Sequence, residues 1–280
     1  MSLIIQRQVK QLGEKGISIL PGKCYKFISI VLQSLVALPF VFLVHLLRPL
    51  VVIRFGKLNS DRIGHFAANT ELYLCERDTG MYNQRTLDIF YHASIICNHQ
   101  LKKMWDRTLL VSRFARPMDR VNRWLPGNES HMIPTPSDRD IHGLLPRTKV
   151  HLSFTPSEEL LGIKSLREMG IQAEAPFVCF HTRDSSYLNR VQSNRNWSYH
   201  DYRDSSIQNY VLAAEEMARR GFYVIRTGVV AKDALTHRNK KIIDYATKGR
   251  TDFLDIFLSS KCHFYIGSAC GICAVPMIFR

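Results

Sequence analysis

The chain has 280 residues, of which 46% are hydrophobic and 22% are charged, a composition that excludes a disordered chain and leaves room for two domains of ordinary size. The formal net charge of +14 could attract nucleic acid, anionic lipid or phosphorylated ligands, and charge does not choose among them. Because the sequence has no long Lys/Arg-rich run and no helix-turn-helix or RNA-binding signature, we expect no nucleic-acid partner.

The first predicted element is an uncharged apolar stretch at residues 27–47, which is about as long as a helix that crosses a bilayer. One acid, Glu14, and several basic residues precede it: Arg7, Lys10, Lys15, Lys23 and Lys26. The positive-inside rule therefore predicts a cytoplasmic N-terminus. We expect no cleavable signal peptide, because the stretch starts late, is too long and lacks a small-residue exit.

The same stretch is interrupted by Gln33, Pro39 and His45, and Arg48 follows it closely. A helix lying in the membrane interface is therefore an alternative to a true span, and a buried helix of a soluble core is a third interpretation. A span would export everything after it, whereas seven cysteines, mostly in apolar runs, are typical of free thiols in a reducing compartment. The sequence thus favours an interfacial anchor, and we assign residues 1–48 to a basic N-terminus and membrane anchor.

A strand at 49–54, a polar loop at 56–64 and a helix at 65–77 follow. The free amides of a helix N-terminus make such a corner suitable for an anion. The residues expected at the corner, or one helical turn beyond it, are Arg62, Gly64, His65, Asn69, Thr70 and Glu71. The acceptor-side or catalytic edge of a cleft and an ordinary β–α turn with surface charges explain this pattern equally well.

The middle of the chain is expected to hold two strands, a short helix and a long loop, at 87–91, 108–111, 118–124 and 126–146. The loop is rich in Pro, Gly, Asp, Asn and Ser, which is typical of a connection between domains. We therefore predict a first domain at 49–148 and a second domain at 149–280.

The second half alternates helices and strands. Helices are expected from a Ser157 cap to a stop at Gly170, from a Ser205 or Ser206 cap to Gly221, and at 252–260; strands are expected at 177–180, 222–226, 241–245 and 263–266. Strands that alternate with helices over short connections predict an α/β fold with a parallel sheet covered on both faces.

Polar residues follow two of these strands where each apolar run stops. His181 and Arg183 come after the strand at 177–180, and Gly267-Ser268 come after the strand at 263–266. Ligands of open α/β sheets bind outside the carboxyl ends of strands. A His, an Arg and a Gly-Ser pair at such ends suit a ligand that carries phosphate.

Cys270-Gly-Ile-Cys273 has the spacing of a metal knuckle. No second pair completes a zinc site, so a packed glycine-rich turn is the better interpretation, and we expect no metal.

Several blocks, taken together, resemble a known family. Four lie in the second half, at 180–184 (FHTRD), 197–207 (WSYHDYRDSSI), 226–228 (RTG) and 252–271, and one lies at 54–76. Their order is similar to that of a family of bacterial glycosyltransferases usually encoded among surface-polysaccharide genes, over most of residues 50–280. His181-Thr-Arg183 also resembles, more distantly, the His-x-Arg element of fucosyltransferases with the GT-B fold.

The resemblance implies a GT-B fold, with two Rossmann-like domains and a nucleotide-sugar donor held mainly by the C-terminal one. It implies transfer of a sugar to a polysaccharide or lipid-linked acceptor, with inversion, without a metal and without a cofactor beyond the nucleotide-sugar co-substrate. The location implied is the cytoplasmic face of a bacterial inner membrane, reached through residues 27–47. A membrane-associated protein that binds sugar nucleotides without catalysis is the alternative.

The resemblance also suggests roles for residues. Arg183 is expected to bind two phosphate oxygens with its guanidinium. The candidate bases for the acceptor hydroxyl are His181, His65 and Asp184. The other donor-binding candidates are Arg203, Arg226, Gly228, Gly267, Ser268 and Gly271, and the acceptor-side candidates are Arg62, Gly64, Thr70 and Glu71.

Members of the resembling family continue beyond the position of Arg280. The resemblance therefore implies a fragment or a shortened member whose donor-side domain is incomplete, and Val275–Arg280 is expected to begin another strand.

Overall fold

The computed structural model describes residues 20–82, 85–135, 137–172, 174–191, 196–231 and 233–280. Residue contacts divide the chain into two compact units: residues up to 57 with 85–91 and 111–133, and residues 58–84 with 92–110 and 134–280. The domain boundary predicted at 148/149 stays a prediction. The basic residues Arg7, Lys10 and Lys15 lie outside the described residues.

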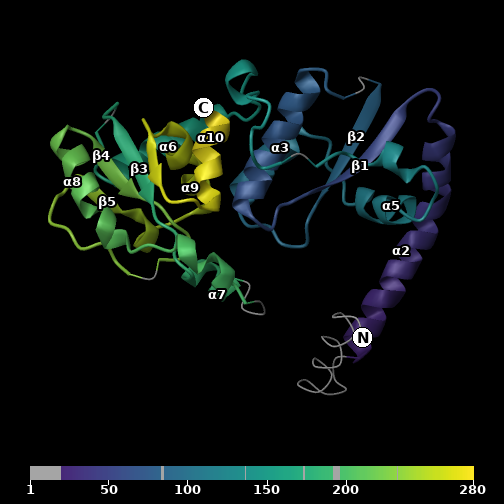
Figure 1. Cartoon of the computed structure of the whole chain (residues 1–280), viewed down its shortest axis with the longest axis horizontal. Helices are drawn as coiled ribbons and strands as arrows, with labels where there is room; N and C mark the ends of the chain where they lie inside the picture. Colours follow the sequence, from purple (N-terminus) through teal and green to yellow (C-terminus); the bar gives the residue numbers. More distant parts are fainter. Residues whose placement is uncertain (1–19, 83–84, 136, 173, 192–195, 232) are drawn as a thin grey trace. The chain divides into compact units, whose positions relative to one another are not determined.

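The first unit contains the predicted apolar helix. Its elements are α2 (Leu20–Leu46), β1 (Val52–Leu58), β2 (Thr86–His92), α5 (Ala115–Asn122) and the 3-10 turn η2 (Asn128–His131) (Figure 1). β1 and β2 form a two-stranded sheet, joined by a bidentate ion pair in which Arg54 donates to Asp88 over 2.6 and 2.7 Å. Residues Cys24–Leu46 of α2 are long and apolar enough to cross a membrane, properties that signal sequences and core helices share.

Only one side of α2 is buried. Ala37 and Val41 pack with Val121 of α5, whereas Phe27, Leu35 and other large apolar side chains on α2 are exposed. The helix is thus attached to the first unit by its C-terminal half and presents an apolar surface elsewhere.

The second unit is built on a parallel four-stranded sheet in the order β5-β4-β3-β6. Its strands are β3 (Phe177–His181), β4 (Tyr223–Arg226), β5 (Ile242–Asp244) and β6 (Tyr265–Gly267). All four lie where the apolar runs predicted them, which confirms the α/β class with a parallel sheet. Its helices and 3-10 turns are α3 (Ile63–Asp78), α4 (His99–Thr108), η3 (Leu145–Arg147), α6 (Pro156–Glu168), α7 (Ser186–Val191), η4 (Ser198–Arg203), η5 (Ile207–Tyr210), α8 (Val211–Arg219), η6 (Tyr245–Thr247), α9 (Asp252–Lys261), η7 (Gly271–Cys273) and α10 (Ala274–Phe279).

Successive side chains of β3 point to opposite faces of this sheet, as the pleat requires. Val178 and Phe180 pack in the cluster that contains Ala214 and Ala218 of α8. Phe177 and Cys179 pack in the cluster that contains Leu254 and Leu258 of α9. Helices therefore cover both faces of the sheet (Figure 1), and the carboxyl ends of the strands are left as the edge at which a ligand can bind.

Three local predictions are wrong. Thr155, not Ser157, caps α6: it accepts from the N–H of Glu158, whose side chain accepts from the N–H of Thr155, a capping box with Pro156 at the first helical position. Residues 108–111 form no strand, because α4 runs to Thr108 and only an isolated bridge joins Phe90 to Val111.

Residues 275–280 form no strand either, since α10 covers 274–279. Pro276 lies in the first turn of that helix, where its missing N–H costs nothing. The predicted helix after Ser206 begins as η5, which Ser206 caps, and continues as α8.

Candidate functional site

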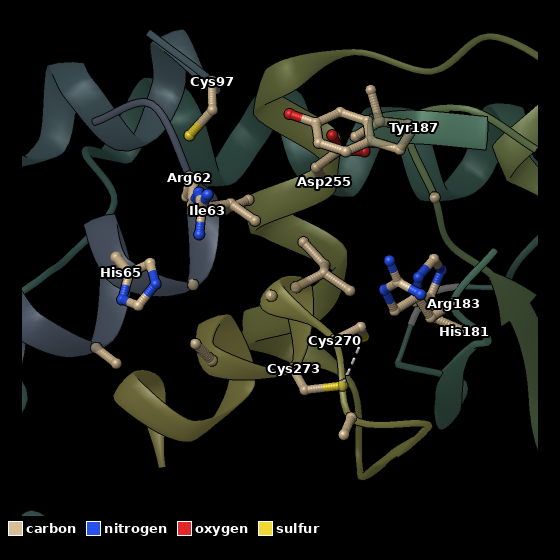
Figure 2. A pocket seen from close by; sticks show the side chains of 18 of the residues that line it. Arg62, Ile63, His65, Cys97, His181, Arg183, Tyr187, Asp255, Cys270 and Cys273 are labelled. Carbon is tan, nitrogen blue, oxygen red and sulfur yellow. Dashed lines mark hydrogen bonds between the residues drawn. The ribbon is translucent and has the colours of Figure 1, made fainter. Parts of the chain in front are cut away.

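A pocket of about 530 Å³ lies within the second unit, at the carboxyl ends of β3, β4 and β6 and beside the start of α3 (Figure 2). Nine of the residues proposed from sequence line it: Arg62, Gly64, His65, His181, Arg183, Asp184, Arg203, Gly228 and Gly271. The structure thus brings candidates for catalysis, for the donor side and for the acceptor side into one cavity. In the close view, Arg62 and His65 lie on one side and His181 and Arg183 on the other.

The wall beyond β3 is fixed by hydrogen bonds to two other loops. The N–H of Ser268 donates to the carbonyl of His181 over 3.3 Å, and the N–H of Arg183 donates to Oγ of Ser268 over 2.8 Å. The Thr182 hydroxyl donates to the Ser205 carbonyl. The backbone that carries His181 and Arg183 is therefore tied to the turn after β6 and to the segment before η5.

The imidazole of His181 is oriented by the chain after β4. Its Nδ1 lies 2.9 Å from the carbonyl oxygen of Thr227. Since a carbonyl only accepts, Nδ1 carries the hydrogen and Nε2 keeps the lone pair. Burial lowers the pKa of His181 below its ordinary value and outweighs the opposing effect of the bond to Thr227. The side chain is therefore neutral at pH 7, the state that a general base needs.

Arg183 is buried, with 8% of the residue exposed, and its guanidinium donates to Asp204. Burial raises the pKa of Asp204, but the guanidinium keeps this carboxyl in an ion pair whose acidic side chain is 24% exposed. Solvent therefore reaches the acid of this pair more than the base.

On the opposite wall, the guanidinium of Arg62 lies over the indole of Trp197, 5.3 Å from the ring centroid. Trp197 is buried, so the ring holds the long Arg62 side chain in place. His65 follows on α3, with Nδ1 3.0 Å from Oδ1 of Asn69 and 3.8 Å from Asp138.

Glycines allow these two walls to meet. A Cβ on Gly64 would lie 2.9 Å from Cα of Gly271, and one on Gly271 would lie 3.2 Å from the nitrogen of Gly64. The backbones in the first turn of α3 and at η7 therefore touch directly, which only residues without side chains permit. Gly228, at φ +151°, has a conformation that L side chains rarely adopt and lies against His181.

The remaining sequence candidates do not line the pocket, and their predicted roles in binding stay predictions. Arg226 is paired with Asp244 over 3.2 Å, Gly267 leaves room for the sulfur of Cys273, and Ser268 accepts from Arg183. Thr70 and Glu71 are buried in α3.

Glu71 belongs to a separate polar cluster. With Cys75 and His151 it places potential metal-ligand atoms within 4.8 Å of one another. The guanidinium of Arg280 already lies 3.0 Å from Glu71 and 3.4 Å from the Cys75 sulfur, and His151 lies 3.1 Å from Glu71. Burial opposes protonation of His151, but hydrogen bonds to Cys75, Glu71 and Asp78 raise its pKa to about 10. The protein's own cations therefore balance the buried acid.

Sequence reasoning missed several residues that line the pocket: Asp61, Cys97, Tyr187, Trp197 and Asp255. Asp255 is the most perturbed acid among them, because burial raises its pKa to about 6, while Arg250 and Tyr245 donate to it. The sequence could have identified Asp255, because it is an acidic residue within the apolar run of α9. Trp197 lies in the block at 197–207 that carried the resemblance.

No protein-family model matches the chain, and no curated protein matches its sequence. A solved structure with a similar arrangement is that of the Escherichia coli ADP-heptose LPS heptosyltransferase II. The match covers 80% of this chain and 82% of the heptosyltransferase chain, with a TM-score of 0.44 and 10% sequence identity. A likeness at this level carries no functional conclusion, so the case for function rests on the pocket.

Proposed function

We propose that the protein is a glycosyltransferase that moves a sugar from a nucleotide-sugar donor to a polysaccharide or lipid-linked acceptor. The observation that carries the proposal is the pocket itself, in which Arg62, Arg183 and Arg203 line the same cavity as a neutral His181 at the carboxyl ends of parallel strands. Strand ends are where open α/β sheets bind nucleotides.

The reaction breaks the bond between the sugar C1 and the diphosphate oxygen and forms a bond from C1 to the acceptor oxygen. The proton of the acceptor hydroxyl goes to Nε2 of His181, and the electron pair of the broken bond stays on the nucleoside diphosphate. Arg183 supports that departure, because a guanidinium stabilises phosphate charge as it develops. Arg62 and Arg203 add positive charge without a metal ion, and direct displacement inverts the anomeric centre.

We further propose that α2 anchors the protein to the cytoplasmic face of a bacterial inner membrane, and two features of this helix support an interfacial anchor over a full span. Its C-terminal half packs against α5, and the Arg120 guanidinium lies 3.4 Å from the carbonyl of Ile30 and from the Ser34 hydroxyl. A charged side chain at the level of Ile30 and Ser34 is costly in the hydrocarbon core and acceptable at its surface.

A panel of nucleotide-sugar donors tests the catalytic proposal. We expect wild-type protein to release nucleoside diphosphate from one donor class in the presence of a glycan or lipid-linked acceptor, and Arg183→Ala to reduce that release strongly. Arg220→Ala removes the same charge from an exposed residue at the C-cap of α8 and should leave the rate unchanged. Binding of nucleoside diphosphate without turnover of any donor would support the non-catalytic alternative instead.

Vesicle flotation tests the anchor. Val36 and Leu43 are exposed and seven residues apart on α2, so Val36→Glu with Leu43→Glu places two charges on one apolar face. We expect wild type to float with anionic lipid vesicles and this variant not to bind them. Gln33→Glu, a change at an already polar position, should still bind. Equal binding of all three proteins would rule out this face as the anchor.

A further inference from the structure

We propose that Cys270 and Cys273 form a reversible disulfide site in the wall of the pocket, which reacts with small-molecule disulfides. The two sulfurs lie 3.1 Å apart, and both residues line the cavity and are partly exposed. In Figure 2 their side chains turn toward each other at the pocket wall. A bond between them needs the sulfurs to approach by about 1 Å.

The surrounding backbone is shaped around the second sulfur. A Cβ on Gly267 would lie only 2.7 Å from Sγ of Cys273, so the glycine at the end of β6 makes the space in which this sulfur sits. Gly271, between the two cysteines, touches Gly64. The turn is therefore supported from both sides, and it holds the thiols close without any need for refolding.

The two thiols are chemically unequal. The hydrogen bond from the Cys270 thiol is the largest effect on Cys273 and lowers its pKa, so Cys273 is the more readily deprotonated of the two. The thiolate is the reactive form in disulfide exchange. Cys97 also lines the pocket, but burial raises its pKa to about 12, which makes it an internal control.

The exchange balances with a small disulfide as the oxidant. The Cys273 thiolate attacks one sulfur of the small disulfide, forms a mixed disulfide and releases one small thiolate. Cys270 then loses its proton and attacks the sulfur of Cys273, which releases the second small thiolate. Two protein thiols are oxidised, one small disulfide is reduced to two thiols, and the two protons go to the leaving thiolates.

Oxidation should loosen the anion site, a consequence that rests on the proposed function. In the reduced pair the Cys273 thiol donates to the carbonyl of Ser268 over 3.3 Å, a bond that a disulfide cannot make. Ser268 in turn accepts from the N–H of Arg183. Loss of the first bond frees the turn that positions Arg183, so we expect the oxidised protein to bind nucleoside diphosphate several-fold more weakly.

Peptide mass analysis tests the disulfide directly. Trypsin releases residues 262–280 as one peptide that contains three cysteines, Cys262, Cys270 and Cys273. After incubation of the full chain with oxidised glutathione and a chelator, we expect this peptide to lose two hydrogens and to retain one alkylatable thiol. Dithiothreitol should reverse both changes, and Cys97 should remain alkylatable.

Three variants assign the bond. Cys262→Ser should still lose two hydrogens, whereas Cys270→Ser and Cys273→Ser should not. A stable glutathione adduct on a single cysteine, full alkylation of both cysteines, or a bond to Cys262 would overturn the inference. Titration of oxidised and reduced protein with a nucleoside diphosphate panel separates the two proposals: a disulfide in a protein that binds no nucleotide refutes the proposed function alone, and nucleotide binding without a disulfide refutes this inference alone.

Discussion

Two arginines at the ends of neighbouring strands differ in their surroundings. Arg226 is the last residue of β4 and shares its side of the pleat with Val224, so it points to a face of the sheet, where it pairs with Asp244. Arg183 comes two residues after the end of β3 and lines the pocket. Both arginines are ion-paired, since Arg183 donates to Asp204. The two differ in position: Arg226 lies on a face of the sheet, and Arg183 lies beyond the strand end, in the wall of the pocket.

The largest expected effect concerns the base that the chain after β3 carries. His181→Asn keeps an amide that can donate to the Thr227 carbonyl but removes the lone pair of Nε2. Since general bases contribute about 10²- to 10⁴-fold, we expect the transfer rate to fall by that factor while the affinity for the donor is unchanged. Steady-state rates with a donor titration measure both quantities. An unchanged rate would remove His181 from the mechanism and leave Asp184 and His65 as candidates.

Replacing each of the two arginines should reduce the free energy of unfolding by a different amount. Arg226→Ala leaves the Asp244 carboxylate, whose side chain is 9% exposed, without its partner, which typically costs about 3–5 kcal/mol. Arg183→Ala leaves Asp204, which solvent reaches more easily, so we expect a smaller loss. Urea unfolding of the two variants makes the comparison. Equal losses would mean that Arg183 is as structural as Arg226.

The contact between the pocket walls gives a smaller effect. Gly271→Ala places a methyl group against the backbone of Gly64, and overpacking of this kind costs about 1–3 kcal/mol. Gly22→Ala, at a position with open space around it, should not destabilise the protein. Thermal unfolding of both variants tests whether the walls touch. A Gly271→Ala protein as stable as wild type would show that they do not.

The smallest effect is a pH dependence due to His181. Its pKa is lowered in the folded state, so the unfolded chain binds more protons below its ordinary pKa of about 6.5. Stability should therefore fall as the pH drops from about 6.5 toward the folded pKa, by at most about 1.4 kcal/mol per pH unit. Histidine titrates between about pH 5 and 8. Unfolding of wild type and His181→Asn across this range measures the difference in their pH dependence. An identical pH slope for both proteins would contradict the lowered pKa.

Much of the second unit could be predicted from sequence, because its strands are short apolar runs that stop at polar residues. Each of β3 to β6 follows this pattern. The capping box of α6 could also have been predicted, since Thr155 and Glu158 have the required spacing. So was α4, in which Leu101, Met104 and Trp105 are spaced as on one helix face and are buried.

The pocket was only partly predictable. Strand ends pointed to His181 and Arg183, and the loop before the predicted helix at 65–77 pointed to Arg62 for the acceptor side and to His65 as a candidate base. All four line one cavity, which the sequence did not predict. That arrangement depends on the contact of Gly64 with Gly271, which no local pattern encodes. The role of Arg226 depends on pleat direction, and a shift of one residue in the strand end would reverse it.

The proposed function requires above all that the pocket binds a nucleoside diphosphate. Calorimetric titration of wild type, Arg183→Ala and Arg220→Ala with a panel of nucleoside diphosphates measures this directly. We predict that wild type and Arg220→Ala bind one member of the panel with equal affinity, and that Arg183→Ala binds it at least about tenfold more weakly, the loss of a charge-assisted contact. Equal binding by all three proteins, or no binding by wild type, would contradict the account.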